Sequence, residues 1–153
     1  MNVDVETVIT IVRPRSEVAA FAADPDNAMA WYRNITSVDW RTAKPLAVGS
    51  QVTFVARFLG RQLSYTYEVT EWVPGERFVQ RTAHGPFPME TTYLWRAASG
   101  DATTMSLRNR GTPSGFTGMV APMMAAAMRR ENRKDLQRLK ALLESRRPEQ
   151  SSR

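Results

Sequence analysis

Residues 3–31 read VDVETVITIVRPRSEVAAFAADPDNAMAW, and the order of elements in this segment is the most informative feature of the chain. Residues 3–12 alternate between apolar and polar side chains and are rich in β-branched types, which predicts a β-strand. The side chains expected on one face of this strand are Val5, Thr7, Ile9 and Ile11. The alternation stops at a proline, so the strand is expected to end there.

Two short helices are predicted directly after this strand. Ser16 can cap a helix over residues 17–23 because its hydroxyl can accept a hydrogen bond from a free backbone N–H. Asp24-Pro25 interrupts that helix, and Asp26 or Asn27 can begin a second one that reaches Trp31. A strand followed at once by two small helices restricts the architectures that the rest of the chain can complete.

The middle of the chain changes to a period of two, which is typical of a series of β-hairpins. Strands are predicted over residues 36–42, 50–59, 62–72, 76–84, 89–97 and 103–110. Turn-forming residues separate them, namely Gly49, Gly60-Arg61, Pro74-Gly75, Gly85-Pro86 and Gly100-Asp101. The sheet is therefore expected to be antiparallel.

The last element has helical spacing and covers residues 122–146, a length of about 37 Å. This helix is long enough to cross the whole sheet. We therefore predict an α+β fold in residues 1–147: a curved antiparallel sheet of about seven strands wrapped around a long C-terminal helix, with two short helices after strand one. Residues 148–153 are predicted to form a frayed polar tail. A bent sheet and a single helix cannot pack closely against each other along their whole length, so a cavity lined by inward-facing side chains is expected between them.

Several short motifs, in this order and spacing, resemble the SRPBCC superfamily of helix-grip proteins. They run from residue 5 to residue 144 and include Val18 and Phe21, the Asp24-Pro25 segment that leads to Trp31, Val48-Gly49-Ser50, residues 69–74, Tyr93-Leu94-Trp95, residues 100–105, and a closing helix with Asp135-Leu136, Leu139-Lys140 and Leu143-Glu144. The chain looks most like the small bacterial polyketide cyclase/dehydrase-like members. The resemblance implies a helix-grip fold around a deep apolar pocket, and it implies no particular reaction because the superfamily holds cyclases, carriers and receptors.

Composition excludes several kinds of site. The chain has no cysteine and a single histidine, so disulfides, thiolate chemistry and multi-histidine metal sites are excluded, and no metal or other cofactor is expected. The net charge of +6 is concentrated in residues 129–153, which carry +5. Arg129, Arg130, Arg133, Lys134 and Arg138 alternate there with Glu131 and Asp135, which favours a solvated helix face and no nucleic-acid partner. No leader or membrane-spanning segment is recognised, so a cytoplasmic location is expected. The protein is expected to be a monomer or a homodimer.

Strand alternation and helical spacing select the residues expected to contact a ligand. They are Phe54, Phe58, Tyr65, Tyr67, Gln80, His84, Tyr93, Trp95 and Asn109 from the sheet, and Met119, Met123, Met124 and Met128 from the start of the long helix. Aromatic side chains with a few polar groups are typical of a small-molecule pocket. Flexible methionines suit a lid over ligands of variable shape, although ordinary core packing explains the same pattern. The polar groups can equally satisfy one another.

The catalytic candidates are His84, Tyr65, Tyr67 and Asn109. His84 is the natural general acid or base because its unperturbed pKa lies near neutrality, but its place beside Gly85 is also consistent with an exposed turn. No nucleophile and no orienting carboxylate is placed beside it by pattern.

Three hypotheses follow from the sequence. The first is binding or transport of a hydrophobic small molecule, polyketide-, aromatic- or lipid-like, in the internal cavity. The second is a polyketide cyclase/aromatase or dehydrase that acts on a ligand in the same cavity. The third is delivery of a quinone or lipid at a membrane surface, with the basic helix face contacting anionic headgroups.

Overall fold

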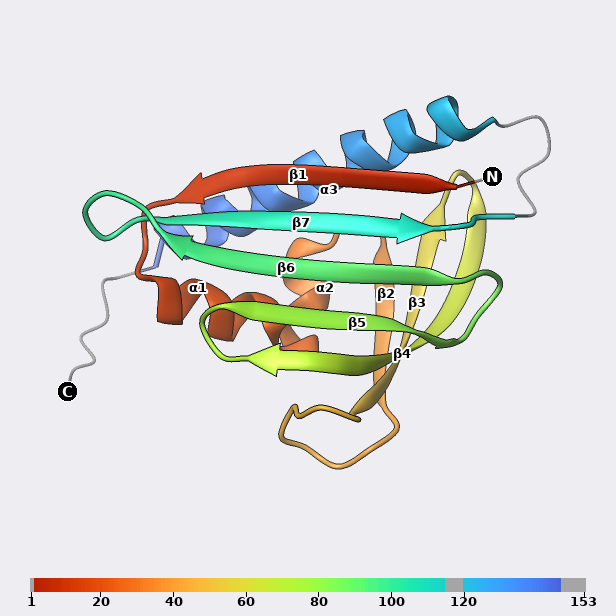
Figure 1. Ribbon diagram of the computed structural model, residues 1–153, viewed down its shortest axis with the longest axis horizontal. Coiled ribbons are helices and arrows are strands. Elements are labelled where there is room, and N and C mark those ends of the chain that lie inside the picture. Colours follow the sequence, from red (N-terminus) through yellow and green to blue (C-terminus); the bar gives the residue numbers. More distant parts are fainter. Residues whose placement is uncertain (1, 115–119, 147–153) are drawn as a thin grey trace.

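The computed structural model describes residues 2–114 and 120–146. Its elements in chain order are β1 (Val3–Ile11), α1 (Arg15–Ala23), the one-turn helix η1 (Pro25–Asn27), α2 (Ala28–Trp31), β2 (Ile35–Trp40), β3 (Gln51–Phe58), β4 (Arg61–Val73), β5 (Arg77–His84), β6 (Met89–Ala97), β7 (Thr103–Gly111) and α3 (Ala121–Glu144). Figure 1 shows this arrangement. The expected tail over residues 148–153 lies outside the described residues.

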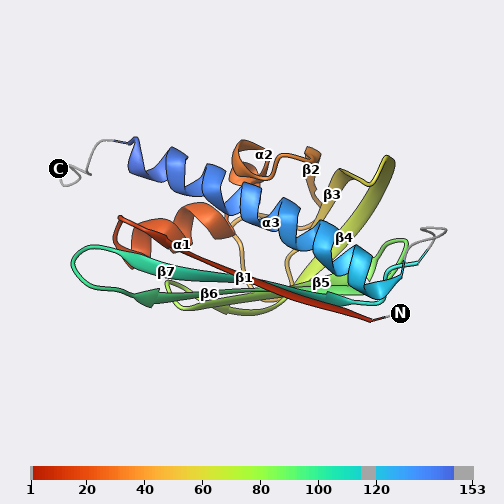
Figure 2. The same cartoon turned by 90° about the horizontal axis from the view of Figure 1, so that it is seen from above.

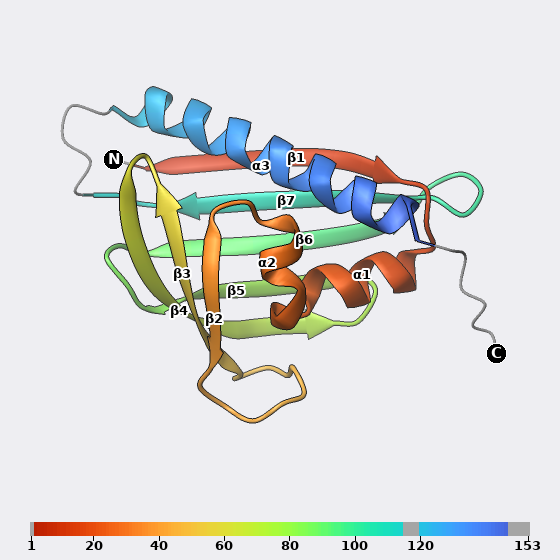
Figure 3. The same ribbon diagram turned by 180° about the vertical axis from the view of Figure 1, so that it is seen from behind.

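The seven strands form one antiparallel sheet in the order β1-β7-β6-β5-β4-β3-β2. Figure 2 shows that α1, α2 and α3 lie on one face of this sheet, and Figure 3 shows α3 crossing β1 and β7 obliquely. The predicted helix-grip architecture is therefore confirmed.

Two irregularities near the middle of the sheet accompany its curvature. β4 is 13 residues long and pairs with both β3 and β5. Its register with β5 shifts between Val69 and Glu71 and again between Thr66 and Tyr67. Each shift is a β-bulge, which bends a strand and increases its twist. β3 and β2 consequently turn towards the helices and cross the direction of β5, β6 and β7 (Figure 1).

The main hydrophobic core lies between helix α1 and the sheet. Val18, Trp95 and Leu139 are among its fully buried members, and they come from α1, β6 and α3 respectively. The aromatic rings of Tyr93 and Trp95 pack edge to face with their centroids 5.8 Å apart. Burial of several large apolar side chains, each worth about 1.5–3 kcal/mol, makes this core the principal source of stability.

The outer edge of the sheet at β1 is covered by the last two turns of α3. The Glu144 carboxylate accepts a hydrogen bond from the Val12 N–H at 2.7 Å, and the Lys140 ammonium donates one to the Thr10 carbonyl at 2.8 Å. Lys140 and Glu144 also form an ion pair with each other at 2.7 Å. The two side chains thus occupy backbone groups that an uncovered edge strand would offer to another strand.

Two local predictions differ from the structure. Helix α1 begins at Arg15 and not after Ser16, because the Pro14 carbonyl already accepts hydrogen bonds from the Glu17 and Val18 N–H groups. The β3–β4 turn is formed by Leu59 and Gly60, one residue earlier than expected, since Phe58 pairs with Arg61. Both turn residues have positive φ, 50° at Leu59 and 79° at Gly60.

Candidate functional site

A cavity of about 180 Å³ lies between the sheet and the helices. Its wall combines aromatic and apolar side chains with a smaller number of polar ones. The lining residues are Ala22, Ala23, Asp24, Pro25, Ala28, Tyr32, Asn34, Ile35, Phe54, Ala56, Arg57, Phe58, Tyr65, Tyr67, Phe78, Gln80, Phe87, Met89, Thr91, Tyr93, Asn109, Pro113, Met128, Glu131, Asn132 and Asp135. Such a composition is typical of sites that hold small organic molecules.

The sheet contributes a row of three polar side chains to this cavity. Gln80 on β5 is paired with Thr91 on β6, and Thr91 is paired with Asn109 on β7. Because paired residues of neighbouring strands project from the same face, the three side chains form a continuous polar row across the sheet. The Tyr67 hydroxyl interacts with the Thr91 side chain, whereas the Asn109 Oδ1 atom is buried without a hydrogen-bond partner among the described residues.

Helix α3 contributes two polar side chains opposite this row. Asn132 and Asp135 are both buried, and they fall within the apolar stripe of Met124, Met128, Leu136 and Leu139. The Asn132 Nδ2 atom is buried and has no hydrogen-bond partner in the described part of the chain. One Asp135 oxygen accepts a hydrogen bond from the Arg33 N–H at 3.1 Å.

The pKa of the Asp135 carboxyl is raised to about 6, chiefly by burial, and the neighbouring Glu131 carboxylate acts in the same direction. The Arg33 backbone hydrogen bond opposes this effect. Removal of a carboxylate from water disfavours its charged form, so such a group exchanges its proton near neutral pH. Asp135 therefore has the protonation behaviour of a general acid or base.

Two tyrosine hydroxyls meet at the inner end of the cavity. The Tyr32 and Tyr93 hydroxyl groups are hydrogen-bonded to each other. Burial raises the pKa of both hydroxyls, so both remain protonated at neutral pH. Each is consequently available as a hydrogen-bond donor to an oxygen in the cavity, at the expense of their mutual bond.

The cavity reaches the surface beside Arg57, which is an exposed member of its lining. A polar bridge crosses this mouth between the start of β2 and helix α3. The Asn34 side-chain amide donates a hydrogen bond to a Glu131 carboxylate oxygen at 3.2 Å, and the Arg33 guanidinium lies 3.6 Å from the same oxygen. Glu131 therefore links α3 to the β2 segment at the entrance.

Eight of the residues predicted to contact a ligand lie on the cavity wall. They are Phe54, Phe58, Tyr65, Tyr67, Gln80, Tyr93, Asn109 and Met128. All but Met128 come from strands in which alternation between the two faces is regular up to that point, and Met128 lies on the apolar stripe of α3.

The other predicted residues lie elsewhere. His84 is exposed, because the register shift in β5 pairs Thr82 with Tyr67 but pairs His84 with the outward-facing Thr66. Trp95 is 1% exposed and belongs to the core under α1, beyond the end of the cavity. Two methionines also fall outside the wall.

Met124 is fully buried among Val3, Leu63 and Met89, and Met123 faces the surface with 51% exposure. Met119 lies outside the described residues. The expectation that Asp135 belongs to a solvated helix face is wrong, since it is 4% exposed.

Sequence reasoning missed Asn132 and Asp135, although a signal for both was present. Met124, Met128, Leu136, Leu139 and Leu143 predict one buried stripe of α3, and positions 132 and 135 lie on that stripe. A polar residue on the buried stripe of a helix is unfavourable for folding, because the apolar pattern is interrupted there. Such unfavourable residues are found most often at functional sites.

The described ranges 2–114 and 120–146 contain no group of three His, Asp or Glu side chains arranged to hold a metal ion. In the same ranges, no helix is both long enough and sufficiently apolar to cross a bilayer.

The sequence of residues 2–144 matches the family described as polyketide cyclase/dehydrase and lipid transport. The chain belongs to this family. A comparison with curated protein sequences finds no significant match.

Solved structures of three proteins illustrate how the family fold recurs. A START superfamily protein from Mycobacterium smegmatis is similar with a TM-score of 0.81 and 12% identity, over 93% of this chain and 97% of that one. The Zhui aromatase/cyclase from Streptomyces sp. R1128 has a TM-score of 0.76 and 16% identity, over 94% of each chain. The ginseng major latex-like protein 151 from Panax ginseng has a TM-score of 0.71 and 11% identity, over 92% of this chain and 96% of that one. At these identities the likeness shows a shared fold alone.

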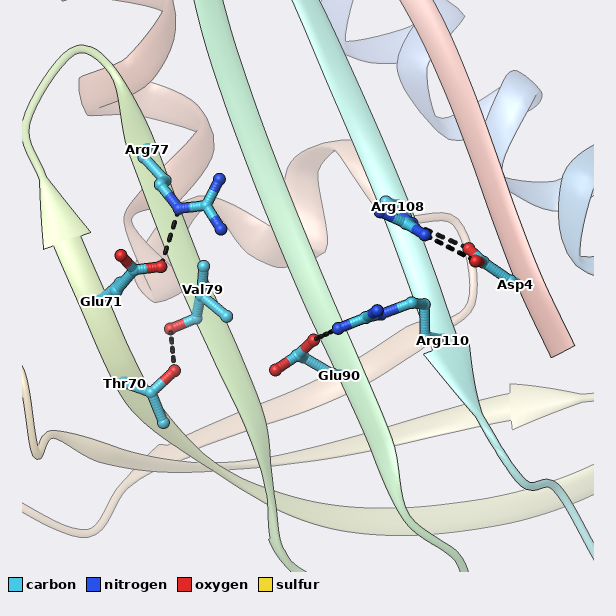
Figure 4. Close-up of polar contacts among 8 residues, drawn as sticks. All are labelled: Asp4, Thr70, Glu71, Arg77, Val79, Glu90, Arg108 and Arg110. Carbon is cyan, nitrogen blue, oxygen red and sulfur yellow. Dashed lines mark hydrogen bonds and ion pairs between the residues drawn. The ribbon is translucent and has the colours of Figure 1, made fainter. Parts of the chain in front are cut away.

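The opposite face of the sheet carries a polar hollow with a different character. Figure 4 shows three arginine–carboxylate pairs on this face, each joining neighbouring strands. The pairs are Arg77 with Glu71 at 2.7 Å, Arg108 with Asp4 at 2.6 Å and Arg110 with Glu90 at 2.5 Å. Exposed pairs of this kind contribute about 0–1 kcal/mol each. In this family member the aromatic cavity, and not the outer face, is the candidate functional site.

Proposed function

We propose that the chain binds a hydrophobic small molecule in the cavity between the sheet and α3. The observation that carries this proposal is an aromatic cavity in which buried polar atoms, Asn109 Oδ1 and Asn132 Nδ2, lack partners. Leaving a buried polar atom unpaired costs about 1–3 kcal/mol, and a ligand that supplies the missing partner recovers that free energy. Phe54, Phe58 and Tyr65 would contact the apolar part of such a ligand.

Native mass spectrometry of protein purified from its own host tests this proposal directly. We expect to detect one bound molecule of defined mass. Denaturation should release this molecule chemically unchanged from its cellular form. The matched control is Ala56→Trp, which places a large side chain on the cavity wall and should abolish the bound mass while a folded protein is retained. Protein that is ligand-free from every preparation, and that binds no aromatic compound added in vitro, would refute it.

A second function, ring closure of a polyketone in the same cavity, is favoured by one specific observation. Asp135 is a buried carboxyl with a pKa near 6, and it shares the cavity with the protonated hydroxyls of Tyr32 and Tyr93. The Asp135 carboxylate would remove a proton from a carbon flanked by two carbonyls. The resulting carbanion would attack a third, more distant carbonyl carbon of the same chain. A tyrosine O–H would stabilise the oxygen of that carbonyl as it becomes an alkoxide, and the Asp135 carboxylic acid would then return the proton to it.

This second function is separated from simple binding by turnover. Asp135→Asn should lower the rate of cyclisation by about 100-fold or more, because positioned proton transfer contributes 10²–10⁴-fold. Tyr93→Phe removes one donor but leaves the carboxyl, and should lower the rate less. Equal rates in wild type and Asp135→Asn would exclude Asp135 as the base.

A further inference from the structure

The size and polarity of the cavity restrict the chemistry of its ligand further than the proposed function does. We infer that the cavity is built for a flat, neutral molecule of one or two rings that carries oxygen on two opposite edges, one a hydroxyl and the other an acceptor. This inference rests on the proposed binding function, and three sets of observations support it.

The first observation is the size and shape of the cavity. A dry cavity of about 150 Å³ accepts benzene, so the present volume of about 180 Å³ suits one or two rings and not an extended acyl chain. The walls are flat aromatic surfaces: the rings of Tyr65 and Tyr67 stack at 5.8 Å with an interplanar angle of 24°, and Phe87 meets Tyr65 edge-on at 5.7 Å. Flat rings pack on such walls by offset stacking and edge contacts.

The second observation is a pair of unsatisfied groups on the cavity wall, one from the sheet and one from helix α3. Asn109 Oδ1 on the sheet side is an acceptor without a donor, and Asn132 Nδ2 on the α3 side is a donor without an acceptor, both among the described residues. A hydroxyl on one edge of a ring can donate to Asn109, and an oxygen on the other edge can accept from Asn132. A fatty acid, with a single polar end, leaves one of these two groups unpaired.

The third observation is the charge of the lining. Asp24, Glu131 and Asp135 line the cavity, whereas the single arginine of the described lining, Arg57, lies at the exposed mouth. A buried carboxylate ligand would therefore meet other carboxylates and no buried cation, which is unfavourable in a site removed from water. The site consequently favours a neutral phenol or enol over an organic acid.

The test is a binding series with four fluorescent probes: naphthalene, naphthol, a naphthalenediol with its hydroxyls on opposite rings, and naphthoate. In wild type at neutral pH, the diol should bind about tenfold more tightly than naphthalene, because it forms two hydrogen bonds that naphthalene cannot form. Naphthol should lie between these two, and naphthoate should bind most weakly.

Two variants connect this preference to the two amides. Asn109→Leu and Asn132→Leu preserve side-chain size and remove one polar group each, so each should reduce the preference for the diol by about threefold to fivefold while naphthalene binding is retained or strengthened. Asn27→Leu is the matched control, since the Asn27 amide is not part of the cavity wall and already donates a hydrogen bond to the Phe21 carbonyl, so this change should leave the preference for the diol unaltered. Both test variants should unfold at or above the wild-type temperature, because each removes an unpaired buried group.

The outcomes separate the two proposals. Binding of naphthalene with no preference for the diol, or a preference unchanged in both leucine variants, overturns the inference about ligand chemistry and leaves the proposed function standing. Tightest binding of naphthoate overturns the argument from charge. Failure of all four probes to bind overturns the proposed function and this inference with it.

Discussion

Replacing Asp135 by asparagine should stabilise the protein in a pH-dependent way. Burial raises the pKa of this carboxyl from 3.8 to about 6. At 1.36 kcal/mol for each unit of pH, the charged form of the folded protein is disfavoured by about 3 kcal/mol. Asparagine is uncharged at every pH and retains an oxygen that can accept the Arg33 N–H hydrogen bond.

The direction of the effect follows from proton binding. Between pH 3.8 and about 6 the folded protein holds a proton that the unfolded chain has released, so stability falls as pH rises through this window. Below the window both states are protonated and Asp135 contributes no difference. Above it the full loss of about 3 kcal/mol is present.

Urea unfolding of wild type and Asp135→Asn across this range measures the effect. The free energy of unfolding of the variant should match that of wild type at about pH 4 and exceed it by about 3 kcal/mol at about pH 8. Asp101→Asn, a change in the exposed β6–β7 turn, is the control and should give a difference that does not vary with pH in this way. A constant difference between Asp135→Asn and wild type across the range would refute the assignment of Asp135 as a buried, destabilising charge.

Four other substitutions test the architecture around the site. Leu59→Asn should raise the free energy of unfolding by about 0.5–1 kcal/mol, since asparagine tolerates the positive φ at this turn better than leucine. Gly60→Ala should lower it by about 1 kcal/mol, because alanine tolerates a positive φ less well than glycine. Chemical denaturation of both variants checks the two opposite signs. Gly111→Ala should destabilise the folded protein by about 1–3 kcal/mol and weaken ligand binding, because the new methyl carbon would lie 2.2 Å from the sulfur of Met89, which is on the cavity wall. A thermal unfolding midpoint equal to that of wild type would contradict this prediction. Glu131→Gln should accelerate ligand release several-fold with little change in stability, since it weakens the contact between Glu131 and Arg33 across the cavity mouth. Stopped-flow displacement of a bound fluorescent phenol measures the release rate. An unchanged rate would show that this contact does not control ligand release.

The fold could be predicted from the sequence because the local signals agree with one another. Strand alternation, turn glycines such as Gly75 and Gly100, and the long apolar stripe ending at Leu143 all point to the same arrangement of sheet and helix. The strand predictions place Tyr67, Gln80 and Asn109 on the correct face for the same reason.

The failures have identifiable physical causes. Alternation predicts the face of a side chain only while a strand is regular, so one extra residue in β5 moves His84 to the outside. Helical spacing cannot distinguish a methionine that reaches the cavity from one that does not, which is why Met124 and Met128 receive the same prediction: both belong to one buried cluster, but only Met128 lines the cavity. The charge of Asp135 and its spacing from the basic residues predict a place on the surface, but Asp135 is buried, because tertiary packing decides burial and the polarity of a single residue does not.

The hydrogen bonds that tie β1 to α3 determine when this chain can finish folding during synthesis. Residues 3–11 leave the ribosome about 100 residues before their strand partners, residues 103–111, and before Lys140 and Glu144, whose side chains cover their outer edge. Until those residues emerge, the backbone N–H and C=O groups on both edges of this valine- and isoleucine-rich segment have no partners, and the segment can pair with a neighbouring nascent chain. β1 is thus made before all the elements that pair with it or cover it, and slow elongation between β1 and α3 should increase the yield of aggregated protein.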